Sequence, residues 1–158
     1  MPKRSAGILA HRRSPATVEV FLVHPGGPFW TKKDEGAWSI PKGLYTSTED
    51  PLEAAKREFE EEVGVAIEGT FIDLGEFKQP GGKIISAWAV ETDLNEAGFK
   101  SNMFEMEWPP GSGNRQLFPE ADRAAWFDME TALKKITKGQ IPIIHALGRQ
   151  LGIELRSP

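Results

Sequence analysis

Residues 43–65 read GLYTSTEDPLEAAKREFEEEVGV, and this stretch decides the fold. Its central part, 52–63, holds no glycine or proline and places its apolar residues at helical spacing. Thr48 or Asp50 can cap the start, and Pro51 suits the first turn. The glycine that follows residue 63 can end the helix. We therefore predict one helix over this central part.

Three glutamates gather on one face of this predicted helix. Because a helix advances about 100° per residue, Glu58, Glu61 and Glu62, at i, i+3 and i+4, cover an arc of roughly 100°. The stretch 43–65 holds seven acidic and two basic residues, whereas the whole chain carries a net charge of only −4. Crowded like charges repel one another unless water or a bound cation relieves them. A solvated helix face is the ordinary explanation of such a run, and a metal site is the functional one.

Carboxylates at this spacing favour a hard divalent cation. Mg²⁺ takes oxygen ligands from a few carboxylates and completes its shell with water and substrate phosphates. The acidic face therefore indicates a magnesium site and points to phosphate chemistry.

The rest of the chain consists of short strands, turns and two further helices. Strands flanking one early helix and two late ones predict an α/β (α+β) class with a mixed sheet. A chain of 158 residues without low-complexity tracts is expected to form one domain, 1–158. The expected strands are 6–10, 18–24, 70–78, 83–91 and 124–127, the expected helices are 129–138 and 141–151, and 95–115 is expected to be irregular, with a long loop at 108–113.

Composition excludes several classes of protein. Without cysteine there is no disulfide, thiolate zinc site, iron–sulfur cluster or cysteine nucleophile. His11, His24 and His145 lack the close spacing of a zinc site, and Lys32-Lys33 and Arg12-Arg13 are too short for a nucleic-acid-binding stripe. No apolar run approaches the ~20 residues of a membrane helix, and the start lacks a signal-peptide pattern. We therefore expect a cytoplasmic protein with no membrane partner and no specific nucleic-acid partner.

The spacing within residues 43–65 resembles the signature of the Nudix hydrolases. That signature is a glycine, five residues, a glutamate, seven residues, and then Arg-Glu-apolar-any-Glu-Glu-any-Gly-apolar. The chain matches every fixed position, with Gly43, Glu49 and the run at 57–65. The resemblance implies an α/β/α sandwich with a mixed sheet over about residues 5–151, built around a loop-helix-loop catalytic motif.

The resemblance also implies which residues organise the motif. Gly43 permits a tight backbone turn whose carbonyl group reaches a metal. Glu49 pairs with Arg57 and so fixes the loop to the helix. Both are expected to shape the site.

Glu58, Glu61 and Glu62 are the metal ligands that the resemblance implies, for one to three Mg²⁺ or Mn²⁺ ions. Either Glu58 or a carboxylate from outside the motif takes the proton of the attacking water. Glu60 lies about 160° from Glu62 around the helix, so we expect it to be solvated surface.

A fourth metal-site carboxylate is expected from the second half of the chain. In related hydrolases a glutamate about six residues before a tryptophan often approaches the metals, and here Glu120 precedes Trp126 by six. Glu105 and Glu107 are the alternatives. Glu120 is the preferred candidate, both as a ligand and as a catalytic group.

Residues that precede the motif narrow the substrate class. The pattern Trp-x-x-Pro-Lys-Gly at 38–43 is similar to the segment found there in diadenosine tetraphosphate hydrolases and diphosphoinositol polyphosphate phosphohydrolases. Lys42 would then lie beside the metal loop and contact a polyphosphate, and Lys83, which opens a strand, is a second candidate. The alternative for both is an ordinary surface lysine.

Aromatic residues in expected loops are candidates for stacking a nucleobase. These are Trp30, Trp108 and Phe118, whereas the other tryptophans lie in apolar runs and are expected in the core. Diadenosine tetraphosphate hydrolases often stack adenine on a tyrosine later in the chain. No tyrosine lies between Lys83 and Trp108, which is a departure from that group.

Together these residues predict a metal-dependent enzyme that hydrolyses a phosphoanhydride bond. The expected substrate is a nucleoside diphosphate linked to another group, either a dinucleoside polyphosphate or a nucleoside triphosphate. Diphosphoinositol polyphosphate and ADP-ribose are alternative substrates, and a catalytically silent nucleotide-sensing module is the non-enzymatic alternative. The expected partner is a small nucleotide, and the expected assembly is a monomer or homodimer.

Overall fold

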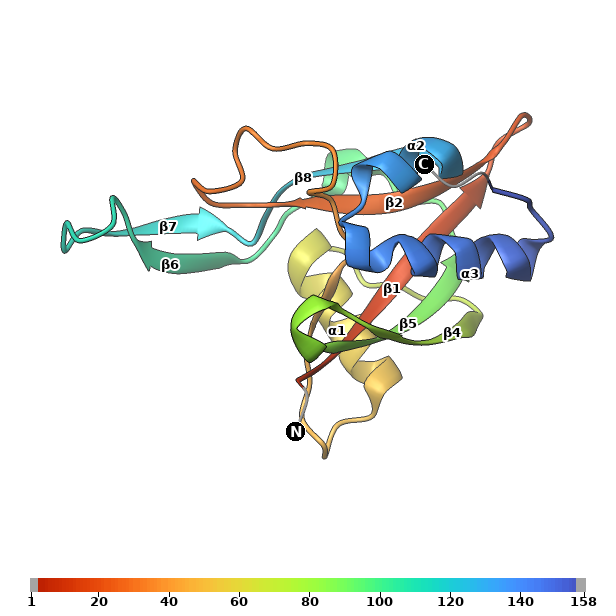
Figure 1. Ribbon diagram of the computed structural model, residues 1–158, viewed down its shortest axis with the longest axis horizontal. Coiled ribbons are helices and arrows are strands. Elements are labelled where there is room, and N and C mark those ends of the chain that lie inside the picture. The colour runs from red at the N-terminus through yellow and green to blue at the C-terminus, as the bar shows by residue number, and fades with distance from the viewer. Residues whose placement is uncertain (1–2, 156–158) are drawn as a thin grey trace.

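A computed structural model describes residues 3–155 of the chain. The main sheet is six-stranded, in the order β4-β5-β1-β2-β8, and β3 pairs with β1 beside this path (Figure 1). Helical and strand segments follow the chain as β1 (Arg4–Arg13), β2 (Val18–Pro25), β3 (Lys42–Leu44), α1 (Pro51–Val63), β4 (Phe71–Lys78), η1 (Pro80–Gly82), β5 (Ile84–Glu91), η2 (Glu96–Gly98), β6 (Met103–Glu107), β7 (Arg115–Pro119), β8 (Ala121–Asp128), α2 (Met129–Lys135), η3 (Lys138–Gln140) and α3 (Ile141–Leu151).

The sheet is mixed because β1 and β5 run parallel while the other pairs are antiparallel. Two strands share the edge of β1 that β5 leaves open. β2 pairs at His11–Arg13 and β3 pairs at Ser5–Gly7, so the two strands diverge along that edge. The predicted mixed α+β class is therefore confirmed.

Helix α1 covers one face of the sheet and begins and ends where the sequence predicts. The Asp50 side chain accepts a hydrogen bond from the Glu53 N–H, so Asp50, not Thr48, is the N-cap, and Gly64 ends the helix with a φ of 90°. Phe59 and Val63 are buried with Phe21 of β2 in this layer of the core. Ala54 is also buried in this layer, whereas Leu52 is only half-buried.

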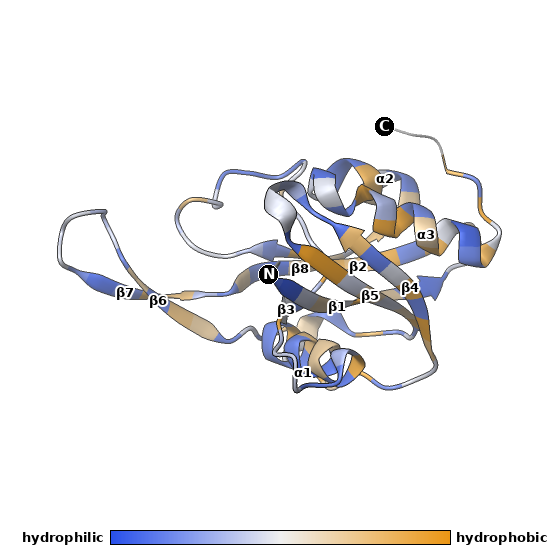
Figure 2. Cartoon of the chain, turned by 60° about the horizontal axis from the view of Figure 1, so that its bottom comes forward, coloured by the Kyte–Doolittle hydropathy of each residue, from blue (hydrophilic) through white to orange (hydrophobic). Residues whose placement is uncertain are grey.

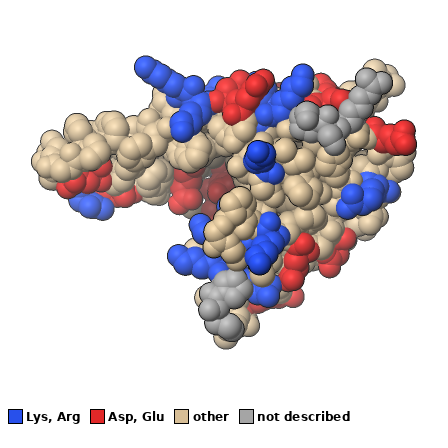
Figure 3. Space-filling view, in the orientation of Figure 1, with Lys and Arg blue, Asp and Glu red and all other residues tan. Residues whose placement is uncertain are grey.

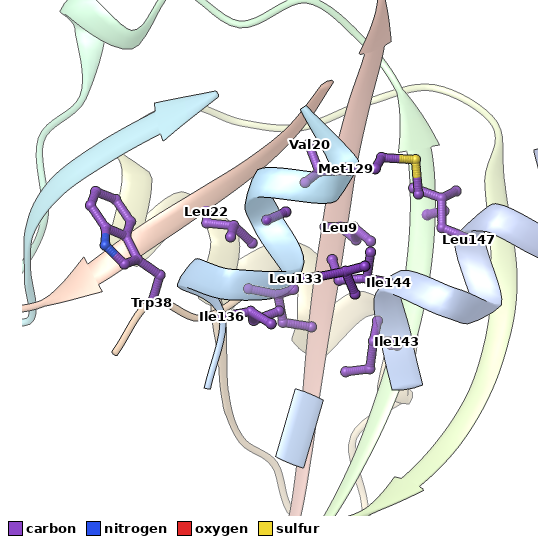
Figure 4. Close-up of a cluster of buried hydrophobic side chains, with 14 of the residues drawn as sticks. Leu9, Val20, Leu22, Trp38, Met129, Leu133, Ile136, Ile143, Ile144 and Leu147 are labelled. Atoms are coloured by element: carbon purple, nitrogen blue, oxygen red, sulfur yellow. The ribbon is translucent and has the colours of Figure 1, made fainter. Parts of the chain in front are cut away.

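Helices α2 and α3 cover the opposite face of the sheet (Figure 2). Leu133 of α2 and Ile144 of α3 pack with Leu9 of β1 and Leu22 of β2 (Figure 4). The Asp128 carboxylate caps α2 by accepting a hydrogen bond from the Thr131 N–H, as the sequence predicts. Two apolar layers thus enclose the sheet and fix the position of α1 relative to β3.

The expectation that residues 95–115 are irregular is wrong in part. β6 and β7 form a two-stranded hairpin that projects from the rest of the molecule (Figure 1). The expected long loop at 108–113 is the connection at the tip of this hairpin. Phe104 packs near Phe118 across the two strands, with their ring centroids 6.1 Å apart. Neither strand pairs with the main sheet, so no alternating buried face marks them in the sequence.

No helix within residues 3–155 combines the length and apolar character that crossing a bilayer requires.

His11 on β1 makes the stability of the fold depend on pH. Its side chain is 2% exposed, and within the described part of the chain its Nδ1 atom has no hydrogen-bond partner. Burial lowers the pKa of His11 below 6.5, Arg13 lowers it further, and Glu91 and the Leu9 backbone oppose the change. The unfolded chain therefore binds a proton at a higher pH than the folded chain does, and the free energy of unfolding falls as pH drops below about 6.5.

We expect denaturant titrations at pH 7.5, 6.5 and 5.5 to show this loss, and His11→Gln, which cannot titrate, to show a smaller one. An equal decline in both proteins would contradict the assignment to His11.

Candidate active site

The acidic face of α1 lies beside the base of the β6–β7 hairpin. The Asn102 N–H donates to the Glu61 backbone carbonyl over 2.9 Å, and the Glu120 N–H donates to the Asn102 carbonyl over 2.8 Å. These two backbone bonds bring Glu120 next to the C-terminal half of α1, although it follows Glu61 by about 60 residues. Figure 3 shows acidic side chains recessed in a hollow between the projecting hairpin and the body of the molecule.

Arg57 connects the loop before α1 to the carboxylates on the helix. Its Nη2 atom lies 3.1 Å from Glu49 Oε2, and its Nη1 atom lies 2.8 Å from Glu58 Oε1 and 3.4 Å from Glu61 Oε1. The Thr46 N–H also donates to the Glu49 carboxylate, and together Thr46 and Arg57 lower the pKa of Glu49. The pair expected between Glu49 and Arg57 is present, and Arg57 bonds the helix carboxylates as well.

Gly43 has a different role from the expected tight turn. It lies within β3 and pairs with Ala6, and its φ is not positive. A Cβ atom at this position would overlap the carboxyl group of Glu58. Glycine is therefore required here because the Glu58 side chain occupies the space that any other residue would fill, which the sequence pattern alone does not reveal.

Two glutamates of α1 carry raised pKa values. Burial raises the pKa of Glu62 to about 8, against the opposing effect of Lys42 and with further increases from Glu120 and Glu58. Burial also raises the pKa of Glu58, Arg57 opposes it, and Glu61 and Glu120 add to it. Glu58 has a side chain only 14% exposed. Glu58 and Glu62 thus lie near other carboxylates in a place that water reaches poorly, which is costly without a cation.

Lys42 is a positively charged side chain that faces the buried glutamates of α1. It lies half-buried at the start of β3, and burial lowers its pKa, as does Lys83, while Glu62 and Glu58 oppose the change. Lys42 and Arg57 together supply two positive charges, against four carboxylates, those of Glu58, Glu61, Glu62 and Glu120.

The side chains of Glu58, Glu61, Glu62 and Glu120 are chemically suited to bind a hard divalent cation. All the candidate donors are carboxylate oxygens, which Mg²⁺ and Mn²⁺ prefer. Burial raises the pKa of Glu58 and Glu62, neighbouring carboxylates add to the rise, and a bound cation would oppose both effects. Among residues 3–155, no three acidic or histidine side chains converge on one point as they are placed. Glu58 and Glu61 each contact Arg57 Nη1 through Oε1, at 2.8 Å and 3.4 Å.

We compared the sequence of the chain with models of known protein families. The NUDIX domain model matches residues 1–147. The chain belongs to the Nudix family. No curated protein matches it in sequence.

Solved structures share the Nudix fold at low sequence identity. A C. elegans Ap4A hydrolase in a binary complex has a TM-score of 0.66 and 20% identity over 94% of this chain and 98% of that one. The NUDIX domain of Shewanella oneidensis NrtR, complexed with ADP ribose, has a TM-score of 0.68 and 12% identity over 96% and 89%. A mutT/nudix family protein from Listeria innocua has a TM-score of 0.63 and 16% identity over 96% of both chains. Identities this low establish a shared fold only.

Glu105 and Glu107, the hairpin carboxylates that were alternatives to Glu120 as a metal ligand, already have partners within this Nudix domain. Glu105 is paired with Arg115 on the neighbouring strand, and Glu107 accepts a hydrogen bond from the Gly111 N–H over 2.7 Å. Glu120 is exposed, and its carboxylate contributes to the raised pKa values of Glu58 and Glu62. Of the three, Glu120 is the one that the structure brings to the acidic face.

A pocket of about 450 Å³ opens beside the acidic face and contains both candidate lysines. Lys42 lines it from β3, and Lys83 lines it from the start of β5. Trp30 contributes from the loop after β2. Sequence reasoning did not find the polar residues that complete the lining, because they come from segments far apart in the chain: Ser5, Ser39, Gln79, Thr137 and Gln140.

The other candidate stacking residues lie elsewhere. Trp108 packs edge-on against Phe29, with ring centroids 5.3 Å apart, and Phe118 packs with Phe104. Neither lines the pocket that holds the lysines. Of the three aromatic candidates, only Trp30 lies in this pocket.

Proposed function

We propose that this Nudix domain hydrolyses a phosphoanhydride bond of a nucleotide in which a nucleoside diphosphate is linked to another group. Dinucleoside polyphosphates and nucleoside triphosphates are the proposed substrates. The observation that carries the proposal is the group of carboxylates around Glu58 and Glu62, which lies next to a pocket lined by two lysines. Family membership and the Nudix hydrolases among the structural neighbours support a pyrophosphohydrolase.

The proposed roles follow from the contacts of each side chain. Glu58, Glu61 and Glu62 would hold the cation, for which we propose Mg²⁺, with Mn²⁺ as a substitute. When bound, such an ion neutralises a diphosphate and makes a water molecule more acidic. The carbonyl of Gly43 stays a proposed metal contact, and the absence of a side chain at this position also leaves room for the Glu58 carboxylate.

The remaining side chains would position the substrate and move a proton. Arg57, fixed by Glu49, orients Glu58. Lys42 and Lys83 would bind phosphate oxygens and stabilise the charge that builds on them. Glu120 is the proposed proton acceptor for the attacking water, since Glu58 is already bonded to Arg57.

A substrate panel tests the proposal. The protein is incubated with Mg²⁺ and diadenosine tetraphosphate, ATP, ADP-ribose or a diphosphoinositol polyphosphate, and product release is measured by chromatography. We expect release from diadenosine tetraphosphate or ATP that stops when EDTA removes the metal. Release from ADP-ribose or the inositol compound alone would favour those alternative substrates. No release from any of the four would favour a silent nucleotide-sensing module.

Substitutions can test whether Glu120 or an acidic residue of the hairpin takes part in catalysis. We expect Glu120→Gln to lower kcat by about 10- to 100-fold, because it removes a carboxylate from the group around the metal. Glu105→Gln is the matched control on the hairpin, and we expect its kcat to stay within about twofold of wild type. The opposite ranking of the two variants would assign the role to Glu105.

A further inference from the structure

Trp30 is a large aromatic residue that the fold leaves partly in solvent. Its side chain is 40% exposed, whereas Trp38, eight residues later, is 4% exposed and packs in the core. Trp30 lines the 450 Å³ pocket that also holds Lys42 and Lys83. An exposed indole beside a pocket with fixed positive charge is typical of a ligand-binding surface.

The loop that carries Trp30 is held at both ends. At its start, the Gly26 N–H donates to the Glu120 carbonyl over 2.9 Å. At its end, the buried ring of His24 has Nε2 2.6 Å from the Lys33 carbonyl oxygen, and Asp34 accepts a hydrogen bond from Trp38 Nε1 over 2.8 Å. These anchors hold the ends of the loop in place beside the pocket, which lowers the entropic cost of ordering the loop when a ligand binds.

The pocket has the chemistry that a nucleoside requires. Lys33 Nζ lies 5.3 Å from the centre of the Trp30 ring, and a cation over one face leaves the other face for a flat ligand. Within the described part of the chain, the hydroxyl groups of Ser5 and Thr137 and the Gln79 carbonyl oxygen make no hydrogen bond, so they can pair with the edge of a base or with ribose. Lys42 lines this pocket and also faces Glu62 and Glu58 of α1, and Lys83 lies near Lys42.

We propose that Trp30 is the platform on which this Nudix domain stacks the base of its substrate, so that it selects nucleotides over polyphosphates that lack a base. The inference rests on the proposed function and deepens it. The phosphates would run past Lys83 and Lys42 toward the acidic face, while the base lies against the indole. A bare polyphosphate or an inositol polyphosphate has no flat ring and would use the lysines alone.

Binding of two matched, non-hydrolysable probes tests the inference. One is methylenediphosphonate, and the other is its nucleoside form, the α,β-methylene analogue of ADP or of UDP; both are titrated calorimetrically with Mg²⁺ present. We expect wild type to bind at least one nucleoside form about 10-fold more tightly than methylenediphosphonate. Trp30→Ala should remove that preference while leaving the Kd of methylenediphosphonate unchanged, and Trp30→Phe should keep most of it.

Phe29→Ala is the matched control, because Phe29 is on the same loop, is 57% exposed and does not line the pocket. We expect its Kd values to equal those of wild type. Unchanged nucleoside binding in Trp30→Ala, or an equal loss for both probes, would overturn the inference. Because binding is measured without turnover, a nucleoside preference that depends on Trp30 in a protein without activity would reject the proposed hydrolysis alone. Activity with no Trp30 effect would reject the platform alone.

Discussion

Glu61→Gln is expected to lower kcat at least about 10²-fold and to leave folding nearly intact. The variant removes a charged oxygen donor from the acidic face while keeping the shape of the side chain. Glu61 is 41% exposed and makes only one longer contact, 3.4 Å to Arg57 Nη1, so little packing or hydrogen bonding is lost. We expect the free energy of unfolding to change by less than about 0.5 kcal/mol. Initial rates at saturating Mg²⁺ and denaturant titration measure the two effects.

Glu60→Gln is the matched control for this variant. Glu60 is on the same helix and has the same charge, but it is exposed and lies about 100° around the helix from Glu61 and about 160° from Glu58 and Glu62. We expect wild-type rates within about twofold. Near-normal activity in Glu61→Gln would refute its role, and an equal loss in Glu60→Gln would show that helix charge, and not a metal donor, sets the rate.

Gly43→Ala is expected to cost about 10²-fold in kcat without unfolding the protein. The added Cβ atom overlaps the Glu58 carboxyl group, so that group must move away from its position beside Arg57. A displacement of about 1 Å at a reacting site can cost that much. Stability should change little, because the atoms that move are the end of a flexible side chain and the backbone φ suits alanine.

Gly98→Ala is the matched control, since a Cβ atom at that position meets only Val65 at 3.9 Å. We expect it to keep wild-type kcat and stability. If Gly43→Ala also retains wild-type kcat, then Glu58 does not need its present position. A second variant, Gly43→Ala with Glu58→Gln, should be no slower than Glu58→Gln alone, because both changes act through the same carboxylate.

Helix α1 could be predicted almost to the residue because its signals are local. Asp50 caps it, Pro51 opens it and Gly64 ends it, and each acts within one turn of the chain. The placement of Glu58, Glu61 and Glu62 on one face likewise follows from helix geometry. Beyond the helix, the strands of the main sheet could be expected from their apolar runs, except β3, whose three residues form no such run and were not predicted as a strand.

The β6–β7 hairpin could not be predicted in the same way. Its strands are mostly exposed and pair only with each other, so neither carries an apolar face that must be buried on the core. Prolines and glycines at 108–113 favour an irregular segment when they are read alone. The pairing is visible only once both strands are placed in space.

The sequence by itself determined the helix, its acidic face and the family to which the chain belongs, because capping, helical periodicity and motif spacing are properties of one continuous segment. Only the tertiary structure decided that Glu120 reaches this face ahead of Glu105, that Gly43 makes room for Glu58, and that Trp30 shares a pocket with Lys42 and Lys83. These relations join residues far apart in the chain. They depend on strand pairing and on the packing of α1 against the sheet, which no local pattern encodes.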